Sequence, residues 1–199
     1  MRKILLTFAA VCFSASLFAG GLVTNTNQSA AWTRLMCRDA TLDADAVYYN
    51  PAGTVMMEKG LHLSVSNQTI TQTRWINTNY PLINGVSGTE DREFVGTIFA
   101  PVFPSIYGVY NLGKIAFSAA FNPIGGGGGA TFSDGIPRIE YDAALIASSL
   151  GAAGVSGYEL DASFEASSIF FGYQVNVAYK INDMLSVALG GRMVTAKNT

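Results

Sequence analysis

Alternation of large apolar residues with small or polar ones is the feature that most constrains how this chain can fold. The clearest case is segment 170–180, FFGYQVNVAYK. Its large apolar residues fall on one face of an extended chain: Phe171, Tyr173, Val175, Val177 and Tyr179. A period of two residues is typical of a β-strand with one apolar face. The sequence therefore predicts a strand here.

Four more segments predict strands: 61–75, 94–110, 115–121 and 184–194. Segment 94–110 is apolar on both faces and contains Pro101 and Pro104. Because proline cannot donate to a strand ladder, these two residues predict a bulge or an interruption of pairing. One helix is expected over 142–154, within an otherwise all-β chain.

The connections alternate between long and short, at 76–93, 111–114, 122–164 and 181–183. Outer-membrane β-barrels have long outer loops and short periplasmic turns, and charged residues make up only 13% of this chain. A secreted β-sandwich also alternates, but this rhythm favours a transmembrane antiparallel β-barrel. Five strands cannot close such a barrel, so we expect the chain to be the amino-terminal part of a longer protein. Gly125–Gly129 lacks the residues of a phosphate loop and is expected in a flexible outer loop.

The amino terminus has the layout of a secretory signal peptide. A basic start, Arg2-Lys3, precedes an apolar run from Ile4 to Phe18, and small residues follow. We place the signal peptide at 1–19, which leaves Cys37 as the only cysteine and excludes an internal disulfide. Residues 20–60 are polar and aperiodic, whereas 61–199 carries the predicted strands.

Several functional classes find little support. A net charge of −2 gives no basic patch for nucleic acid. Asp39, Asp43 and Asp45 lack the glycine and closing glutamate of a calcium loop, so we expect a solvated acidic stretch and no metal or cofactor. His62 and Ser64 share a strand face, but no orienting acid can be identified. We expect no enzyme, and an outer-membrane lipid hydrolase is the least favoured reading.

Segment 94–110 suggests an apolar interior. A water-filled lumen requires polar side chains, yet both alternating sets of this segment are largely apolar. We predict that Phe99 and Phe103 point inward and bind hydrophobic cargo.

The chain resembles the FadL-type transporters of Gram-negative outer membranes, which carry long-chain fatty acids and aromatic hydrocarbons. The resemblance rests on GGLVTN, on DADAVYYNPAG, on the segment FAPVFPSIYGVYNLGKIAFSAAFNPIG and on NVAYKINDMLSVALGGRM. It implies a fourteen-stranded barrel whose lumen holds a hatch, here residues 20–60. The most specific piece, the hatch motif, is Asn50-Pro51-Ala52. By its turn chemistry, we expect the Asn50 side chain to bond to backbone groups.

The resemblance also implies how cargo moves. Leu22 and Val23 would lie near the binding pocket, and cargo would leave sideways beside a kinked strand, 115–121. The residues assigned to that lateral opening are Phe121, Asn122, Pro123 and Gly125.

The sequence thus predicts a monomeric passive channel in the outer membrane, surrounded by outer-membrane lipid. Its expected partners are hydrophobic small molecules, fatty acids first and aromatic hydrocarbons second. The alternative is a structural or adhesion barrel that binds partners through its outer loops.

Overall fold

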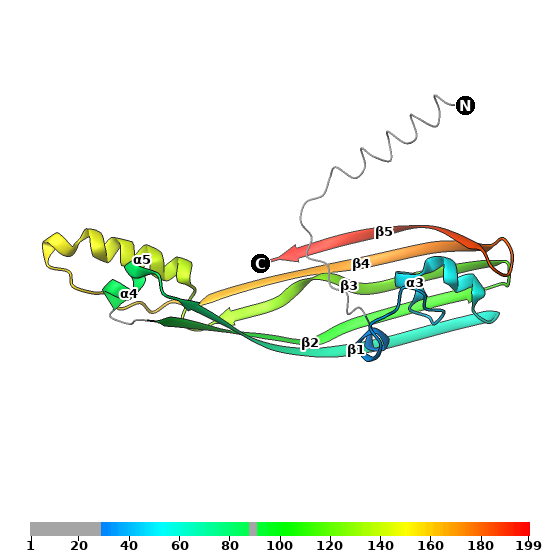
Figure 1. Ribbon diagram of the computed structural model, residues 1–199, viewed down its shortest axis with the longest axis horizontal. Coiled ribbons are helices and arrows are strands. Elements are labelled where there is room, and N and C mark those ends of the chain that lie inside the picture. Colours follow the sequence, from blue (N-terminus) through cyan, green and yellow to red (C-terminus); the bar gives the residue numbers. More distant parts are fainter. Residues whose placement is uncertain (1–28, 88–90) are drawn as a thin grey trace, which may run out of the picture.

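The chain forms one antiparallel sheet with few helices. The computed structural model describes residues 29–87 and 91–199; the predicted signal peptide, Leu22 and Val23 lie outside this part. Five long strands follow one another in the order of the sequence (Figure 1). They are β1 (Gly60–Thr78), β2 (Arg92–Asn111), β3 (Ile115–Phe132), β4 (Phe164–Lys180) and β5 (Ser186–Asn198). Among the described residues, no helix has both the length and the apolar character needed to cross a membrane.

The five predicted strands are all present, and β3 is longer than predicted. We expected it to end at residue 121 and Gly125–Gly129 to form an outer loop, and this was wrong, because β3 runs to Phe132. Gly126 and Gly128 have φ of 93° and 73°, a conformation that glycine adopts without strain. A Cβ on Gly126 would lie 2.2 Å from the Ser168 carbonyl oxygen of β4. These glycines therefore let β3 continue through two irregular steps against β4.

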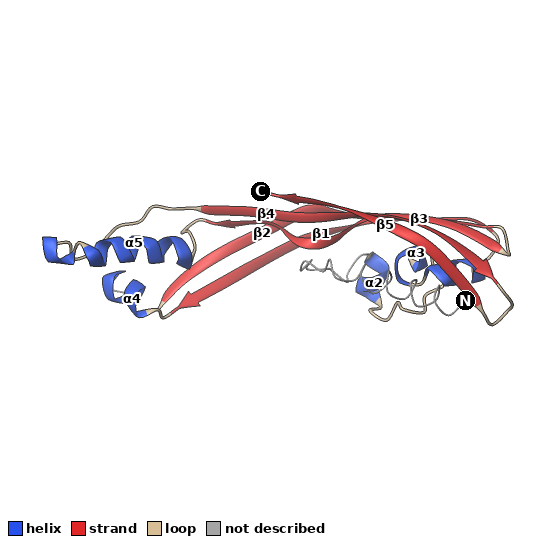
Figure 2. Ribbon diagram, turned by 90° about the horizontal axis from the view of Figure 1, so that it is seen from above, coloured by secondary structure: helices blue, strands red, loops and turns tan. Residues whose placement is uncertain are grey.

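The two long connections carry helices at one end of the sheet (Figures 1 and 2). They are α4 (Pro81–Ser87), α5 (Pro137–Ser149) and the short helix η2 (Gly151–Ala153). The helix predicted at 142–154 exists, but it starts five residues earlier, with Pro137 in its first turn. Buried Glu140 of α5 accepts hydrogen bonds from Arg92 Nε at 3.2 Å and from the Tyr158 hydroxyl at 2.9 Å. This contact fixes α5 to the start of β2.

The amino-terminal segment lies on one face of the sheet, toward its other end (Figure 2). It contains α2 (Ala30–Arg34), α3 (Ala46–Tyr49) and the 3₁₀ helix η1 (Pro51–Met56). We call the sheet face beneath α3 and η1 the covered face and the opposite one the bare face.

The sheet does not hide its large apolar residues on one face, as a water-soluble sheet does. Ser118, Gln174 and Asn176 are buried on the covered face. The bare face exposes large apolar side chains, among them Leu63 (70% exposed), Val65 (76%), Val175 (64%) and Leu189 (83%). A half-solvated antiparallel sheet normally places its apolar residues under the core and its polar residues in water.

Candidate functional site

The segment Val47–Gly53, VYYNPAG, is the part of the amino-terminal segment that holds it to the sheet. The carbonyl of Val47 accepts two amide hydrogen bonds from β4, from Gln174 Nε2 at 2.8 Å and from Asn176 Nδ2 at 3.1 Å. Asn176 Nδ2 also donates to Ser118 Oγ of β3, at 3.2 Å. One backbone carbonyl thus joins α3 to β4, and Asn176 in turn links this contact to β3.

Further polar contacts involve β5 and β2. The guanidinium of Arg192 lies 4.3 Å from the centre of the Tyr48 ring, a cation–π contact, and donates to Gln174 Oε1. Ser186 Oγ donates to the carbonyl of Ala52 at 2.7 Å. Asn111 Nδ2 reaches the carbonyls of Val55 and Met57. Residues 47–57 are therefore attached by polar contacts to β2, β4 and β5, mostly through their own backbone.

Asn50 and Gly53 shape the segment internally. We expected the Asn50 side chain to satisfy a backbone group, and it donates to the Thr41 carbonyl at 3.2 Å. Pro51 begins η1. A Cβ on Gly53 would lie 2.4 Å from Asn50 Nδ2, so only glycine leaves room for this amide. The motif is thus a compact turn as well as a docking element.

We expected Asp39, Asp43 and Asp45 to form a solvated acidic stretch, and this was wrong for Asp45. Asp45 is 3% exposed and accepts two hydrogen bonds from Arg38, at 2.8 and 2.6 Å, while exposed Asp43 accepts a third. The hydrogen bond to Asp45 raises the pKa of the Arg38 guanidinium above its ordinary value. This paired charge closes the loop ahead of α3. The described residues contain no cluster of His, Cys, Asp and Glu suited to a metal ion.

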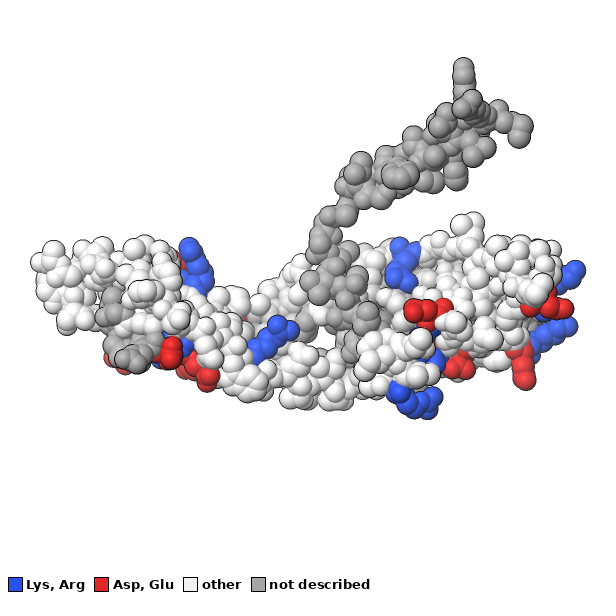
Figure 3. Space-filling model, in the orientation of Figure 1, with Lys and Arg blue, Asp and Glu red and all other residues white. Residues whose placement is uncertain are grey.

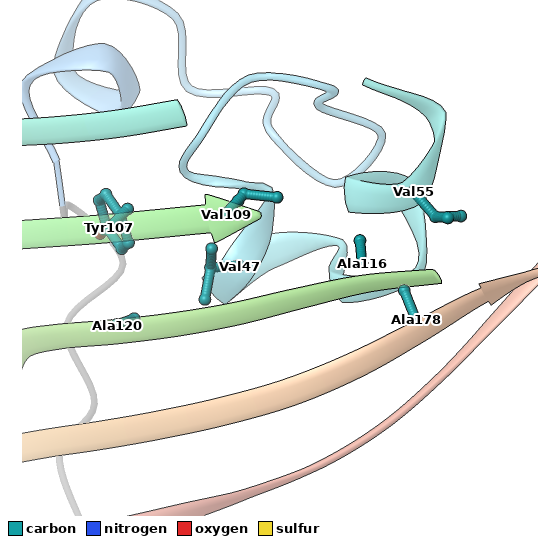
Figure 4. Close-up of a cluster of buried hydrophobic side chains, with 7 residues drawn as sticks. All are labelled: Val47, Val55, Tyr107, Val109, Ala116, Ala120 and Ala178. Atoms are coloured by element: carbon teal, nitrogen blue, oxygen red, sulfur yellow. The ribbon is translucent and has the colours of Figure 1, made fainter. Parts of the chain in front are cut away.

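A small apolar cluster lies between the segment and the sheet (Figure 4). Its members come from both layers: Val47, Val55, Tyr107, Val109, Ala116, Ala120 and Ala178. The sheet contributes three alanines, whose short side chains allow α3 and η1 to approach closely. Partly buried Tyr48, Met56 and Met57 surround the cluster.

The pairing of β2 with β3 is interrupted midway along both strands. The strands pair at one end, up to Ile106 with Phe121, and again from Ile98 with Ala130. Between these two stretches, residues 99–105 and 122–129 are not paired with each other; outside the irregular steps, the first stretch pairs with β1 and the second with β4. Figure 1 shows β3 bending along its length.

Proline and an extra residue explain the interruption. The register of β2 against β1 shifts between Gln68 and Ile70, which confirms the bulge predicted from Pro101 and Pro104. On β3, Pro123 lacks an N–H and the register against β4 shifts beside it. The strand that we expected to be kinked, 115–121, pairs regularly on both sides, and the irregular steps begin just beyond it, between Pro123 and Gly125. Of the residues assigned to the lateral opening, Phe121 forms the last regular pair, and Asn122, Pro123 and Gly125 lie buried just beyond it.

A shallow hollow of about 600 Å³ adjoins the interruption, near the helical end of the sheet. Apolar residues, including Ile98, Ala130 and Phe132, form most of its lining, and Arg74 of β1 contributes the single charged side chain. Arg74, Gly96 and Phe132 lie in register across β1, β2 and β3. A Cβ on Gly96 would overlap the Phe132 ring, at 2.3 Å, so the missing side chain leaves space for this ring.

Phe99 and Phe103 do not share a face. Phe103 is 6% exposed and follows the covered-face alternation of β2, whereas Phe99 is 63% exposed. The extra residue at the β2 bulge switches the alternation, so two odd-numbered positions point to opposite faces. The prediction that both point inward is therefore wrong for Phe99.

The remaining candidates have local roles. His62 lies on the covered face, and its Nε2 contacts the Glu58 carbonyl at 2.8 Å. Cys37 is exposed and is the free cysteine of the described residues. The sequence analysis did not single out Arg74 or Arg192. The signal that could have identified them is a single positively charged residue on the small or polar face of a predicted strand.

Comparisons with protein-family models, curated proteins and solved structures found no match.

Proposed function

We propose that the protein is a passive outer-membrane channel for hydrophobic compounds, of the FadL type that the sequence resembles. The observation that carries the proposal is the exposure of large apolar side chains on the bare face, opposite a covered face that buries polar ones. A face with Leu63, Val65 and Leu189 exposed suits hydrocarbon, and a covered face with Gln174 and Asn176 suits the interior of a barrel. We infer that β1–β5 form part of a barrel wall and that residues 20–60 are its hatch.

The interrupted β2–β3 pair supports a sideways route for cargo. Antiparallel neighbours in a barrel normally bond along their full length, because unpaired backbone groups are costly in lipid. Here residues 99–105 and 122–129 are not bonded to each other, and the hollow lies beside them. Apolar cargo would rest in the hollow and pass between β2 and β3 into the bilayer. No covalent step is needed.

Transport can be tested by filling the hollow. Ala130 lines the hollow, whereas its exposed neighbour Thr131 alternates to the bare face. We expect Ala130→Trp in the full-length protein to lower uptake of radiolabelled oleate severalfold in cells lacking their own fatty-acid channel. The matched control, Thr131→Trp, should transport like the wild type at equal amounts in the outer membrane. Absence of oleate uptake by the wild type would refute the function; equal uptake by Ala130→Trp would refute the route.

A second candidate, an adhesion barrel, is favoured by α5. This helix exposes Leu145 (49%) and Ile146 (61%), and Leu150 follows at its end (47%). The helix α5 lies at the helical end of the molecule (Figure 1), where an outer partner would bind. Deleting residues 20–30 separates the two functions: a transporter should lose or change ligand binding, and an adhesin should not.

A further inference from the structure

Asn67 and Thr69 are polar residues on the bare face of β1. Both are exposed, and they follow Leu63 and Val65 along the same row of alternate positions. In the proposed barrel this face contacts lipid, where a polar side chain without a partner is costly. Both side chains have partners, and these partners are backbone atoms of β2.

The bonded backbone atoms lie on either side of the extra residue in the β2 bulge. Thr69 lies opposite two residues of β2, Pro101 and Val102. Just after them, the Phe103 N–H donates to Asn67 Oδ1 at 2.9 Å. The Pro101 carbonyl accepts from Thr69 Oγ1 at 3.1 Å and from Asn67 Nδ2 at 3.4 Å. Two side chains of β1, which we call the β1 clamp, thus replace ladder bonds that the bulge disrupts.

The bulge lies in the middle of the stretch of β2 that is not paired with β3, residues 99–105. Several backbone groups of this stretch are not available to β3. Pro101 and Pro104 have no N–H to donate. The Pro101 carbonyl and the Phe103 N–H are bonded to the β1 clamp. This arrangement disfavours closure of the gap between β2 and β3.

We propose that Asn67 and Thr69 are positioning residues that fix the β2 bulge and so hold open the gap through which cargo would leave. The role in release rests on the proposed transport function. In the wall of a barrel, the clamp satisfies two backbone groups that lipid cannot satisfy. Neither residue lines the hollow, so their loss should affect release of cargo and not its binding.

Hydrogen exchange tests the clamp independently of transport. Exchange of the Phe103 amide would be followed by NMR in the full-length protein in detergent. Asn67→Ala removes the acceptor of this amide, and exchange should become about tenfold faster. The matched control, Asn77→Ala, removes another exposed asparagine from the same face of β1, away from the bulge, and should leave this exchange unchanged. Unchanged exchange in Asn67→Ala would overturn the clamp.

A comparison of binding with uptake tests the role in release. Asn67→Ala combined with Thr69→Val removes every bond of the clamp, and the valine keeps the shape of threonine. Oleate uptake should fall severalfold at equal amounts in the outer membrane, while the equilibrium affinity for oleate changes by less than about twofold. Asn67→Ala with Thr69→Ser keeps the hydroxyl group and should recover part of the uptake. The matched control, Asn77→Ala with Thr71→Val, should transport like the wild type.

The other outcomes contradict the inference. Equal losses of binding and uptake would show that the substitutions alter the hollow. Unchanged uptake despite faster exchange of the Phe103 amide would show that the clamp does not hold the route open, and either result leaves transport itself intact. An equal loss in the matched control would show that polar residues of this face in general are needed. A wild type that takes up no oleate would overturn the transport function and the role in release, and exchange of the Phe103 amide alone would then decide whether the clamp exists.

Discussion

Gln174→Ala should loosen the amino-terminal segment without unfolding the sheet. Gln174 is 8% exposed, and its amide connects the Val47 carbonyl with Arg192. The substitution removes one hydrogen bond to the segment, at about 1 kcal/mol. It also releases Arg192 from its position at the Tyr48 ring, at about 0.5–1 kcal/mol. The Val47 carbonyl keeps its hydrogen bond from Asn176. The free energy that holds the segment on the sheet therefore falls by about 2 kcal/mol in total.

Hydrogen exchange measures this loss directly. The amides of Tyr49 and Asn50 donate to the carbonyls of Asp45 and Ala46 within α3, and they exchange when the segment leaves the sheet. A loss of about 2 kcal/mol corresponds to roughly thirtyfold faster exchange of these amides. Amides in the paired centre of β4, such as that of Val175, should keep their rates because the strand ladder is intact.

The matched control is Gln72→Ala. Gln72 lies on β1 opposite Ile98, away from the segment, and its side chain is exposed. This variant should exchange like the wild type at Tyr49 and Asn50. Unchanged exchange in Gln174→Ala, or acceleration spread evenly over α3 and the strands, would refute the reasoning that this amide holds the segment.

Two further predictions concern the turn and the helical end. Gly53→Ala should displace the Asn50 amide, which a new Cβ would meet at 2.4 Å, and lower the free energy of unfolding by about 1–3 kcal/mol in a thermal melt. The control is Gly151→Ala, whose Cβ would have no atom within 4 Å. Equal effects of the two substitutions would contradict the steric argument. Burial and the hydrogen bond to Glu140 raise the pKa of Tyr158 to about 12. The neutral phenol therefore stabilises the contact with α5 fully below pH 10, and this contribution disappears as the pH rises through 12. Subtracting the phenolate absorbance titration of Tyr158→Phe from that of the wild type should yield this value, and ionisation near 10 would contradict it.

The alternation of residues determined the fold class and the number of strands. Each of the five predicted segments became a strand. Except in 94–110, which is apolar on both faces, the reason is that a period of two leaves a chain with one apolar face only when it is extended. The sequence also placed the bulge in β2, since Pro101 and Pro104 cannot donate to a ladder. Asn50 was identified as a residue that bonds to the backbone, through turn chemistry that acts over a few residues.

Only the tertiary structure decided which residues of distant segments contact each other. The glycines of 125–129 belong to β3, because the approach of β4 beside Ser168 excludes a Cβ at Gly126. Phe99 faces away from Phe103, because one extra residue reverses the alternation along β2. Arg38 forms an ion pair with buried Asp45, and Gln174 donates a hydrogen bond to the Val47 carbonyl, more than a hundred residues away in the sequence. The chemistry of single residues can be read along the chain, but their partners depend on register and on packing between layers, which no local pattern encodes.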